Sequence, residues 1–241
     1  MNVSEALATR MSCRAFLPTP VPEATLRAIL DGAKQAPSGG NLQPWRVYAL
    51  SGAPLQEFLD LIRSRIPMHP RGEGSEYEIY PTALWEPYRS RRFKCGEDMY
   101  ATIGVARDDK LARLLQFARN YEFFGAPVGL FFCLDRRMGP PQWSDLGMYM
   151  QSVMLLAREH GLHTCAQEAW SVWYRTVGEF LRLPAELMLF SGMALGYRDE
   201  AAPINRLRTE RAPLASGASV GMATNAARAR AIRAVSVTTA K

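Results

Sequence analysis

Apolar side chains recur at helical spacing in several stretches of the chain, and each such stretch predicts an amphipathic helix. Four residues with the spacing i, i+3, i+4, i+7 mark one helix between Pro22 and Pro37: Leu26, Ile29, Leu30 and Ala33. Further helices are predicted over four ranges: 53–66, 111–120, 144–160 and 177–183. We expect Ser4 to cap a short helix at the N-terminus and Ser144 to cap the long one.

Short runs rich in β-branched, aromatic or uninterrupted apolar residues predict strands between these helices. Four ranges carry such runs: 45–50, 128–134, 162–170 and 187–197. Helix dominates and the strands are separated, so we predict an α+β fold with helices packed on a small sheet. Residues 67–103 are irregular, aromatic and charged, and no Gly/Ser or Pro linker isolates them, which indicates an insertion within the domain.

Length and composition favour one domain with an ample core, since 241 residues are 48% hydrophobic. No apolar run approaches the roughly 18 residues of a membrane span. The N-terminal stretch carries Glu5 and no continuous apolar segment, so we expect no secretion signal. The four cysteines lie far apart without a C-x-x-C pair, which favours a reduced, cytoplasmic chain without a metal site.

The chain is basic, with a net charge of +6, and part of this excess lies in residues 215–241. This stretch is rich in Ala, Ser, Thr and Arg and poor in aromatics, so we expect a weakly ordered basic tail. A nucleic-acid-binding tail is the alternative, but the interleaved aromatics of such segments are missing. An anionic cofactor or substrate explains part of the charge equally well.

The N-terminal stretch RMSCRAF places cations at alternate positions. In an extended segment, Arg10, Ser12 and Arg14 point to one side, while Met11 and Cys13 point to the other. Alternate cations repel each other unless an anion lies between them. Taken alone, the stretch favours an ordinary solvated strand edge.

Two further stretches offer groups that bind polar ligands. The loop APSGGNLQPW brings the glycine-flanked Ser38 together with the amide side chains of Asn41 and Gln43, which suit a heterocycle with donors and acceptors. The same loop could simply end a helix. Near the C-terminus, Arg208 and Arg211 stand in INRLRTERAPL, where guanidinium groups suit a phosphate or form a basic surface loop.

Taken together, these stretches resemble the FMN-dependent nitroreductase family. The matching marks occur in the family's order over about residues 4–214: RMSCRAF, APSGGNLQPW, FFGAPVGL, GLHTCAQEA and R-T-x-R-x-P-L. The resemblance is strongest to the branch acting on nitrobenzoates. It implies a three-layer α+β sandwich with a small mixed or antiparallel sheet, an intertwined homodimer, and FMN at the subunit interface. Residues 1–214 would be the FMN-binding domain, with residues 67–103 as an insert or lid.

The resemblance also implies roles for individual residues. Arg10 and Ser12 would hold the FMN phosphate with Arg211 and Arg208, and Arg14 would lie by the flavin pyrimidine ring, where the reduced flavin gains charge. The remaining cofactor-binding residues would be Met11, Cys13, Pro37, Ser38, Gly39, Asn41, Gln43, Asn120, Gln167 and Glu168. Of these, the loop residues would come from the second subunit, and Glu168 would turn its backbone N–H toward flavin N5. Relatives carry Pro-x-Glu-Gly where this chain has Ala-Gln-Glu-Ala.

The family's chemistry belongs to the flavin, and no residue is expected to act as a catalytic acid or base. NAD(P)H would pass a hydride to N5, and a nitroaromatic or quinone would then be reduced in the same cavity by a ping-pong cycle. Tyr88, Arg92 and Phe124 are the candidate substrate-binding residues, although Tyr88 and Arg92 also suit a surface helix. Reduction of quinones or enones, dehalogenation of aromatics, and a non-catalytic flavin- or nucleic-acid-binding role are the alternatives.

Overall fold

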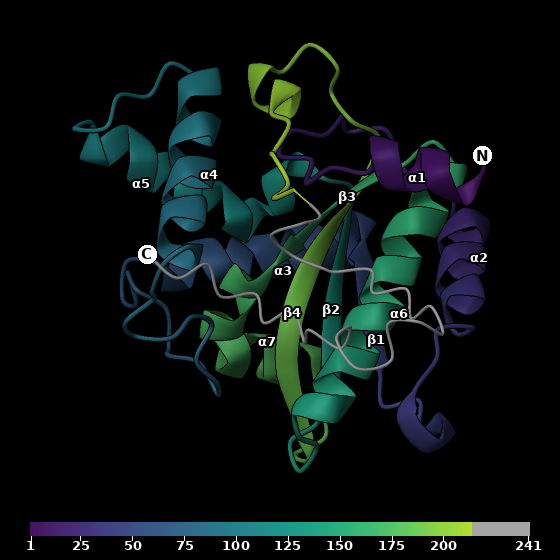
Figure 1. Cartoon of the computed structure of the whole chain (residues 1–241). Helices are drawn as coiled ribbons and strands as arrows, with labels where there is room; N and C mark the ends of the chain where they lie inside the picture. Colours follow the sequence, from purple (N-terminus) through teal and green to yellow (C-terminus); the bar gives the residue numbers. More distant parts are fainter. Residues whose placement is uncertain (214–241) are drawn as a thin grey trace, which may run out of the picture. The chain divides into compact units, whose positions relative to one another are not determined.

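The computed structural model describes residues 1–213 and contains a four-stranded antiparallel sheet (Figure 1). Its strands follow the order β1-β2-β4-β3. They are β1 (Arg46–Ser51), β2 (Val128–Asp135), β3 (His163–Gln167) and β4 (Leu187–Gly196). All three strand pairings are antiparallel. The four predicted strands and the small antiparallel sheet are therefore confirmed.

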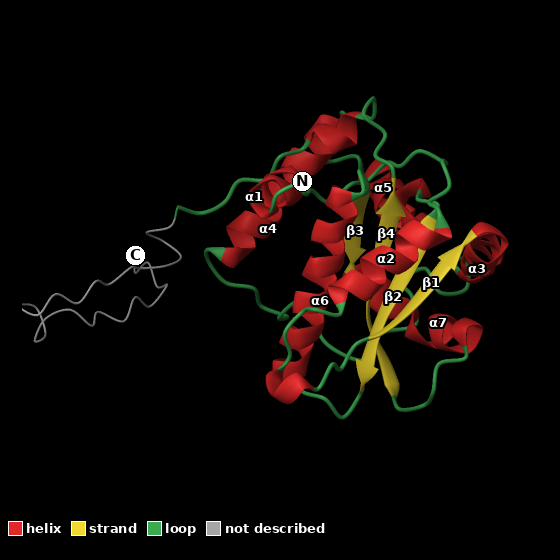
Figure 2. Cartoon of the chain, turned by 90° about the vertical axis from the view of Figure 1, so that its right-hand side faces the viewer, coloured by secondary structure: helices red, strands yellow, loops and turns green. Residues whose placement is uncertain are grey.

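Helices cover both faces of this sheet, so three layers result (Figure 2). One face packs against α2 (Glu23–Ala33) and α6 (Pro140–Glu159), and the other against α3 (Gly52–Arg65) and α7 (Tyr174–Leu181). The remaining helices are α1 (Val3–Thr9), α4 (Tyr88–Thr102) and α5 (Lys110–Ala118), with 3-10 turns η1 (Gly39–Asn41), η2 (Arg119–Gly125), η3 (Glu168–Trp173) and η4 (Pro203–Arg206). The predicted α+β class is confirmed.

Strand β2 is apolar from Val128 to Leu134 because both of its faces are covered there. Leu130 and Phe132 join the core beneath α2 and α6, whereas Phe131 and Cys133 join the core beneath α3 and α7. Burial raises the pKa of the Cys133 thiol to about 12, so this thiol stays protonated and unreactive. The unbroken apolar run in the sequence follows from this central position.

A bulge in β4 shifts the side-chain alternation of that strand. Phe132 of β2 pairs with Ser191, but the next residue, Cys133, pairs with Leu189, so Phe190 is the extra residue. As a result, Leu189 and Ala194 both face α3 and α7 although one position is odd and the other even.

Glycines on the α3/α7 face make room for two stacked rings. Phe123 and Trp170 stack with their ring centroids 4.6 Å apart. A Cβ atom at Gly129 would lie 2.4 Å from the Phe123 ring, and one at Gly192 would lie 2.2 Å from the Trp170 ring. Both strands need glycine here because the rings lie directly against the backbone.

Two predicted helix caps are wrong. Asn2 rather than Ser4 caps α1, where its side chain accepts a hydrogen bond from the Glu5 N–H at 2.9 Å. Helix α6 begins at Pro140, and Ser144 lies inside it, with its hydroxyl donating to the Pro141 carbonyl at 2.6 Å. The earlier start follows from proline, whose fixed φ and missing N–H suit the first helical turn.

The stretch 67–103, expected to be irregular, contains helix α4. No residue of α4 is buried, so its sequence has no apolar stripe by which periodicity could reveal it. The part of the insert before α4 is anchored to the core. The Glu73 carboxylate accepts hydrogen bonds from the Thr176 N–H at 3.0 Å and from its hydroxyl at 2.7 Å.

The compact unit that holds these elements is Met1–Leu207, and residues 208–213 belong to a second unit. The expected weakly ordered tail, residues 215–241, lies outside the described residues. In the part of the chain that the structure describes, no helix is long and apolar enough to span a membrane.

We expect Gly192→Ala to lower the free energy of unfolding by about 1–3 kcal/mol, because the added methyl collides with the Trp170 ring. Urea unfolding measures this change. Gly178→Ala in α7 is the matched control, since a Cβ atom there meets nothing within 4 Å. Equal unfolding free energies for the two variants would contradict the packing argument.

Candidate functional site

The N-terminal row, which we define as residues Arg10 to Arg14, lies against β3. Its side chains alternate between half-buried and buried positions, as expected. The Cys13 N–H donates to the Thr164 carbonyl at 2.9 Å, and Ser12 forms an isolated parallel bridge with Thr164. Cys13 is fully buried, whereas Arg10 and Arg14 are half-buried. The pairing with β3 therefore separates a buried side from a partly open side that carries both guanidinium groups.

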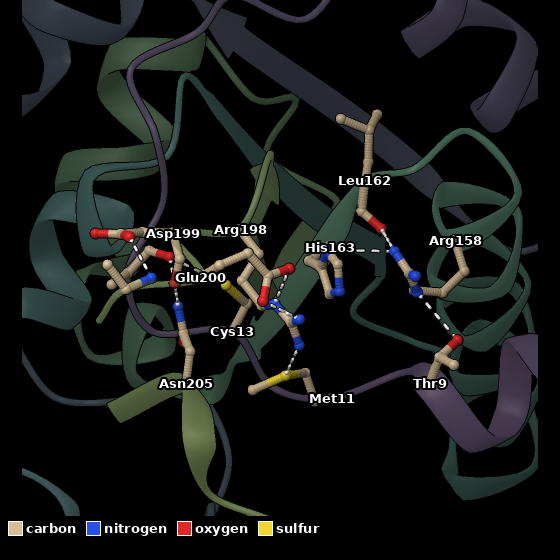
Figure 3. A network of polar contacts seen from close by, with 12 residues as sticks. Thr9, Met11, Cys13, Arg158, Leu162, His163, Arg198, Asp199, Glu200 and Asn205 are labelled. Carbon is tan, nitrogen blue, oxygen red and sulfur yellow. Dashed lines mark hydrogen bonds and ion pairs between the residues drawn. The ribbon is translucent and has the colours of Figure 1, made fainter. Parts of the chain in front are cut away.

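Polar contacts anchor the buried side of the row (Figure 3). The Arg198 guanidinium donates to the Met11 sulfur at 3.2 Å and forms an ion pair with Glu200. Arg158 of α6 donates to the Leu162 carbonyl at 2.8 Å and contacts the His163 Nδ1 at 3.2 Å. These arginines are engaged by the protein itself, whereas no ion-pair partner of Arg10 is found among the described residues.

Asn205 fixes the backbone of the row, and sequence reasoning missed this role. Its Oδ1 accepts a hydrogen bond from the Arg14 N–H at 2.8 Å, and its Nδ2 donates to the carbonyls of Ala15 and Asp199 at 2.8 and 2.9 Å. The residue is only 4% exposed. Its partners Arg14 and Ala15 lie 191 and 190 positions away in the sequence, and a backbone-binding asparagine has no local signature.

The glycine loop 37–43 forms a strained and open turn. Gly40, Asn41 and Gln43 have φ angles of 57°, 57° and 49°, a region that glycine and asparagine tolerate best. The Gln43 N–H donates to the Ser38 hydroxyl at 3.0 Å. Ser38 is half-buried, and the other predicted residues of this loop are exposed: Pro37, Gly39, Asn41 and Gln43.

Asp145 of α6 supports this loop through its side chain, and sequence reasoning also missed this role. Its buried carboxylate accepts the Gly39 N–H, with both oxygens 3.3 Å from the nitrogen. The other predicted loop groups face outward, where a ligand or a second chain can reach them. One buried anion therefore holds the backbone that presents them.

A second set of predicted residues meets at the end of β3. The Gln167 side-chain amide donates to the Asn120 carbonyl at 2.8 Å and to its Oδ1 at 3.2 Å. The Gln167 Oε1 is buried and has no hydrogen-bond partner among the described residues. Glu168 follows as the first residue of η3, and the protein atoms around its carboxyl group raise its pKa by desolvation.

Of the three candidate substrate residues, Tyr88 and Arg92 lie one turn apart on α4, whereas Phe124 lies in the core. Tyr88 begins α4, is 41% exposed and meets Trp85 edge to face. The Arg92 guanidinium lies 4.3 Å from the Tyr80 ring centroid. Phe124 is 2% exposed and belongs to the core beneath α3 and α7, so the protein itself covers its side chain.

Arg208 and Arg211 lie in the second unit, and both are exposed. The Arg211 guanidinium donates to the Thr209 hydroxyl at 2.7 Å and to the carbonyls of Thr209 and Glu210. These local bonds fold the side chain back on its own segment.

The donor set fits a flavin mononucleotide better than a metal ion. Arg10, Ser12 and Arg14 offer cationic and hydroxyl donors to a phosphate or a polarised carbonyl. The unpartnered Oε1 of Gln167 is an acceptor of the kind that a heterocyclic N–H or a ribityl hydroxyl satisfies. Within residues 1–213, no group of three or more His, Cys, Asp or Glu side chains could hold a metal.

Comparison with known proteins identifies the class. Residues 7–197 match the model of the nitroreductase family, and the chain belongs to that family. A 4-nitrobenzoate reductase of Pseudomonas putida is 37% identical over 205 residues, which cover 85% of this chain and 89% of the relative. A nitrobenzene nitroreductase of Ectopseudomonas oleovorans is 34% identical, with 85% and 90% coverage. The predicted family and enzyme class, an oxidoreductase, are confirmed.

Two solved structures share the fold over almost their whole length. The FMN and NADPH-dependent nitroreductase NfnB from Sphigopyxis sp. strain HMH has a TM-score of 0.86 and 50% identity, covering 89% of this chain and 96% of that one. The FMN-dependent nitroreductase NfnB from Mycobacterium smegmatis, in complex with NADPH, has a TM-score of 0.85 and 28% identity, with 92% and 100% coverage. The nitroreductase-like fold is therefore confirmed.

We expect Asn205→Ala to lower the free energy of unfolding by about 2–4 kcal/mol, because it removes three hydrogen bonds to backbone groups and leaves the Arg14 N–H without its acceptor. Chemical unfolding followed by tryptophan fluorescence measures the change. Asn2→Ala, which removes an exposed helix cap, is the control and should cost about 1 kcal/mol. A loss no larger than that of the control would show that Asn205 does not hold the row.

Proposed function

We propose that this chain is an FMN-dependent NAD(P)H oxidoreductase that reduces nitroaromatic compounds. The observation that carries the proposal is the row of Arg10, Ser12 and Arg14, held on the open side of a segment paired with β3. The similarity to an FMN and NADPH-dependent nitroreductase, 50% identical over 96% of that chain, supports the same cofactors. The nitroaromatic names of the relatives support the acceptor class.

Arg10 and Ser12 would bind the FMN phosphate, and the resemblance to nitroreductases assigns the same role to Arg208 and Arg211. A guanidinium group keeps its charge at every working pH and matches phosphate oxygens with two parallel hydrogen bonds. Arg10, which has no ion-pair partner among residues 1–213, is available for this contact.

The glycine loop would reach the flavin of a second subunit, so the working form would be a homodimer. The exposed loop residues Pro37, Gly39 and Asn41 support an intermolecular contact. Large apolar side chains are also exposed elsewhere: Val3 and Leu7 of α1 by 70% and 52%, and Met148 of α6 by 38%. Apolar surface of this kind is typical of a face that another chain covers.

The bound flavin would supply hydride chemistry, taking two electrons from NAD(P)H and delivering them to the acceptor. Arg14 would stabilise the negative charge that reduction places near flavin N1 and the C2 oxygen. Glu168 would contribute its backbone N–H near N5. Donor and acceptor would occupy one cavity in turn, which is a ping-pong order, and protons would come from water.

Tyr88 and Arg92 of α4 would contact the acceptor. An exposed aromatic ring can stack on a planar nitroaromatic, and a guanidinium group can attract a substrate carboxylate. Phe124 is left out of the substrate contacts because its side chain lies in the core.

Anaerobic titration tests the proposed reaction. Purified protein should bind FMN, and NADH or NADPH should bleach the visible flavin absorbance. Addition of 4-nitrobenzoate should then restore the absorbance, with a quinone as a second acceptor for comparison. Protein that stays colourless after addition of FMN, or flavin that is not bleached by either nucleotide, would overturn the proposal.

We expect Arg14→Ala to bind FMN more weakly and to slow flavin reduction by about 100-fold, because a preorganised cation is lost where charge develops. Stopped-flow bleaching at saturating FMN and NADPH measures the rate. The rate of flavin reduction in Arg14→Lys should fall between the rates of the unmodified protein and of Arg14→Ala, since lysine keeps the charge without the bidentate geometry. Arg27→Ala, an exposed ion-pair arginine of α2, is the control and should leave the rate unchanged. An unchanged rate in Arg14→Ala would exclude this role.

A further inference from the structure

The side-chain amide of Gln167 donates hydrogen bonds to a single residue, Asn120. Gln167 ends β3 and is only 2% exposed. Its Nε2 lies 2.8 Å from the Asn120 carbonyl oxygen and 3.2 Å from the Asn120 Oδ1. The two acceptors belong to the backbone and the side chain of one residue, so this amide forms hydrogen bonds with Asn120 at two points.

Asn120 is held from its other end as well. Its Nδ2 donates to the Phe117 carbonyl in the last turn of α5, at 2.8 Å. Asn120 therefore cannot rotate about its side-chain torsions without breaking a bond to Gln167 or to Phe117. The Phe117 bond uses one Nδ2 hydrogen, and each amide nitrogen carries two.

Packing alone does not explain a glutamine at this position. Desolvating an amide costs free energy unless all its groups are paired, and the Gln167 Oε1 has no partner among the described residues. Its neighbours on this face, Cys165 and Trp170, belong to the hydrophobic core. A methionine would fill the same space without the unpaired amide oxygen, and it would lose only the two hydrogen bonds that the amide donates to Asn120.

We propose that Gln167 is a positioning residue that orients Asn120 for contact with the flavin. This proposal rests on the proposed function, in which Asn120 lies at the ribityl or pyrimidine edge of FMN. An amide that is already fixed loses little conformational entropy when it binds a ligand. Gln167 acts through its side-chain N–H groups and thereby ties the end of β3 to the 3-10 turn η2.

The first test removes the N–H donors without changing the volume. Gln167→Met should raise the FMN dissociation constant about tenfold, measured from the rise in flavin fluorescence when the holoenzyme is diluted. Gln56→Met is the matched control, because the Gln56 side chain donates to Asp60 on the exposed surface of α3. The control should bind FMN as the unmodified protein does.

A double-mutant cycle with Asn120→Ala tests whether the effect passes through Asn120. If Gln167 acts by orienting Asn120, then Gln167→Met adds little once Asn120 is alanine, and the double variant binds FMN about as weakly as Asn120→Ala. Thermal unfolding of each holoenzyme is recorded alongside. Additive losses of FMN affinity would overturn the proposal, because they would mean that the two residues act independently.

Gln167→Glu supplies a second variant with a readout that a merely structural role does not produce. A protonated glutamic acid can still donate one hydrogen bond to Asn120, whereas an ionised one faces two acceptor oxygens. FMN binding by this variant should therefore weaken as the pH rises from about 5 to about 8. Burial raises the pKa values of Tyr121 and Cys165, so both stay protonated over this range, and the pKa of Glu168 is raised by burial in both proteins. The ratio of dissociation constants at each pH therefore isolates the new carboxyl group. A ratio that does not change with pH would count against the proposal.

Measurements on the unmodified protein show whether a negative result concerns the proposed function or only the role of Gln167. If it binds no FMN, the proposed function itself is wrong. If it binds FMN and Gln167→Met binds FMN equally well, only the role of Gln167 is wrong.

Discussion

The hydrogen bond from the Cys13 N–H to the Thr164 carbonyl decides what the N-terminal row can do. In an extended segment, a shift of one residue in register moves every side chain to the opposite face. With the observed register, Arg10 and Arg14 are half-buried, whereas Met11 and Cys13 are covered. A one-residue shift would bury two cations and expose a thiol. The chemistry of this site therefore depends on a backbone pairing.

That pairing is short, and buried polar groups hold it in place. Asn205 binds the backbone of Arg14 and Ala15, and the Arg198 guanidinium donates a hydrogen bond to the Met11 sulfur. Asp145 does the same for the glycine loop by accepting the Gly39 N–H. In each case a buried or half-buried polar side chain binds neighbouring protein, and the residues that remain open are the ones that a ligand can contact.

Much of the fold could be predicted because its elements bury regular faces. The runs that became β2 and β4 are apolar on both sides, and α2 carries its stripe of Leu26 and Ile29. Helix α4 could not be predicted in the same way because it buries nothing. Ser144 was a false cap, since a serine inside a helix and one at its start look alike until Pro140 is seen to occupy the first turn.

The residues of the site also differ in how well the sequence predicts them, and the reason is again physical. Arg10, Ser12 and the glycine loop stand in motifs, because their own side chains or backbones would meet the ligand. Asn205 and Asp145 could not be found from the sequence, because the site segments that they hold, at Ala15 and at Gly39, are bound through backbone groups 190 and 106 positions away. A backbone N–H or carbonyl is the same in every residue and leaves no trace in a sequence. The groups that orient a site are therefore harder to predict than those that touch its ligand, and they have to be found among buried polar atoms.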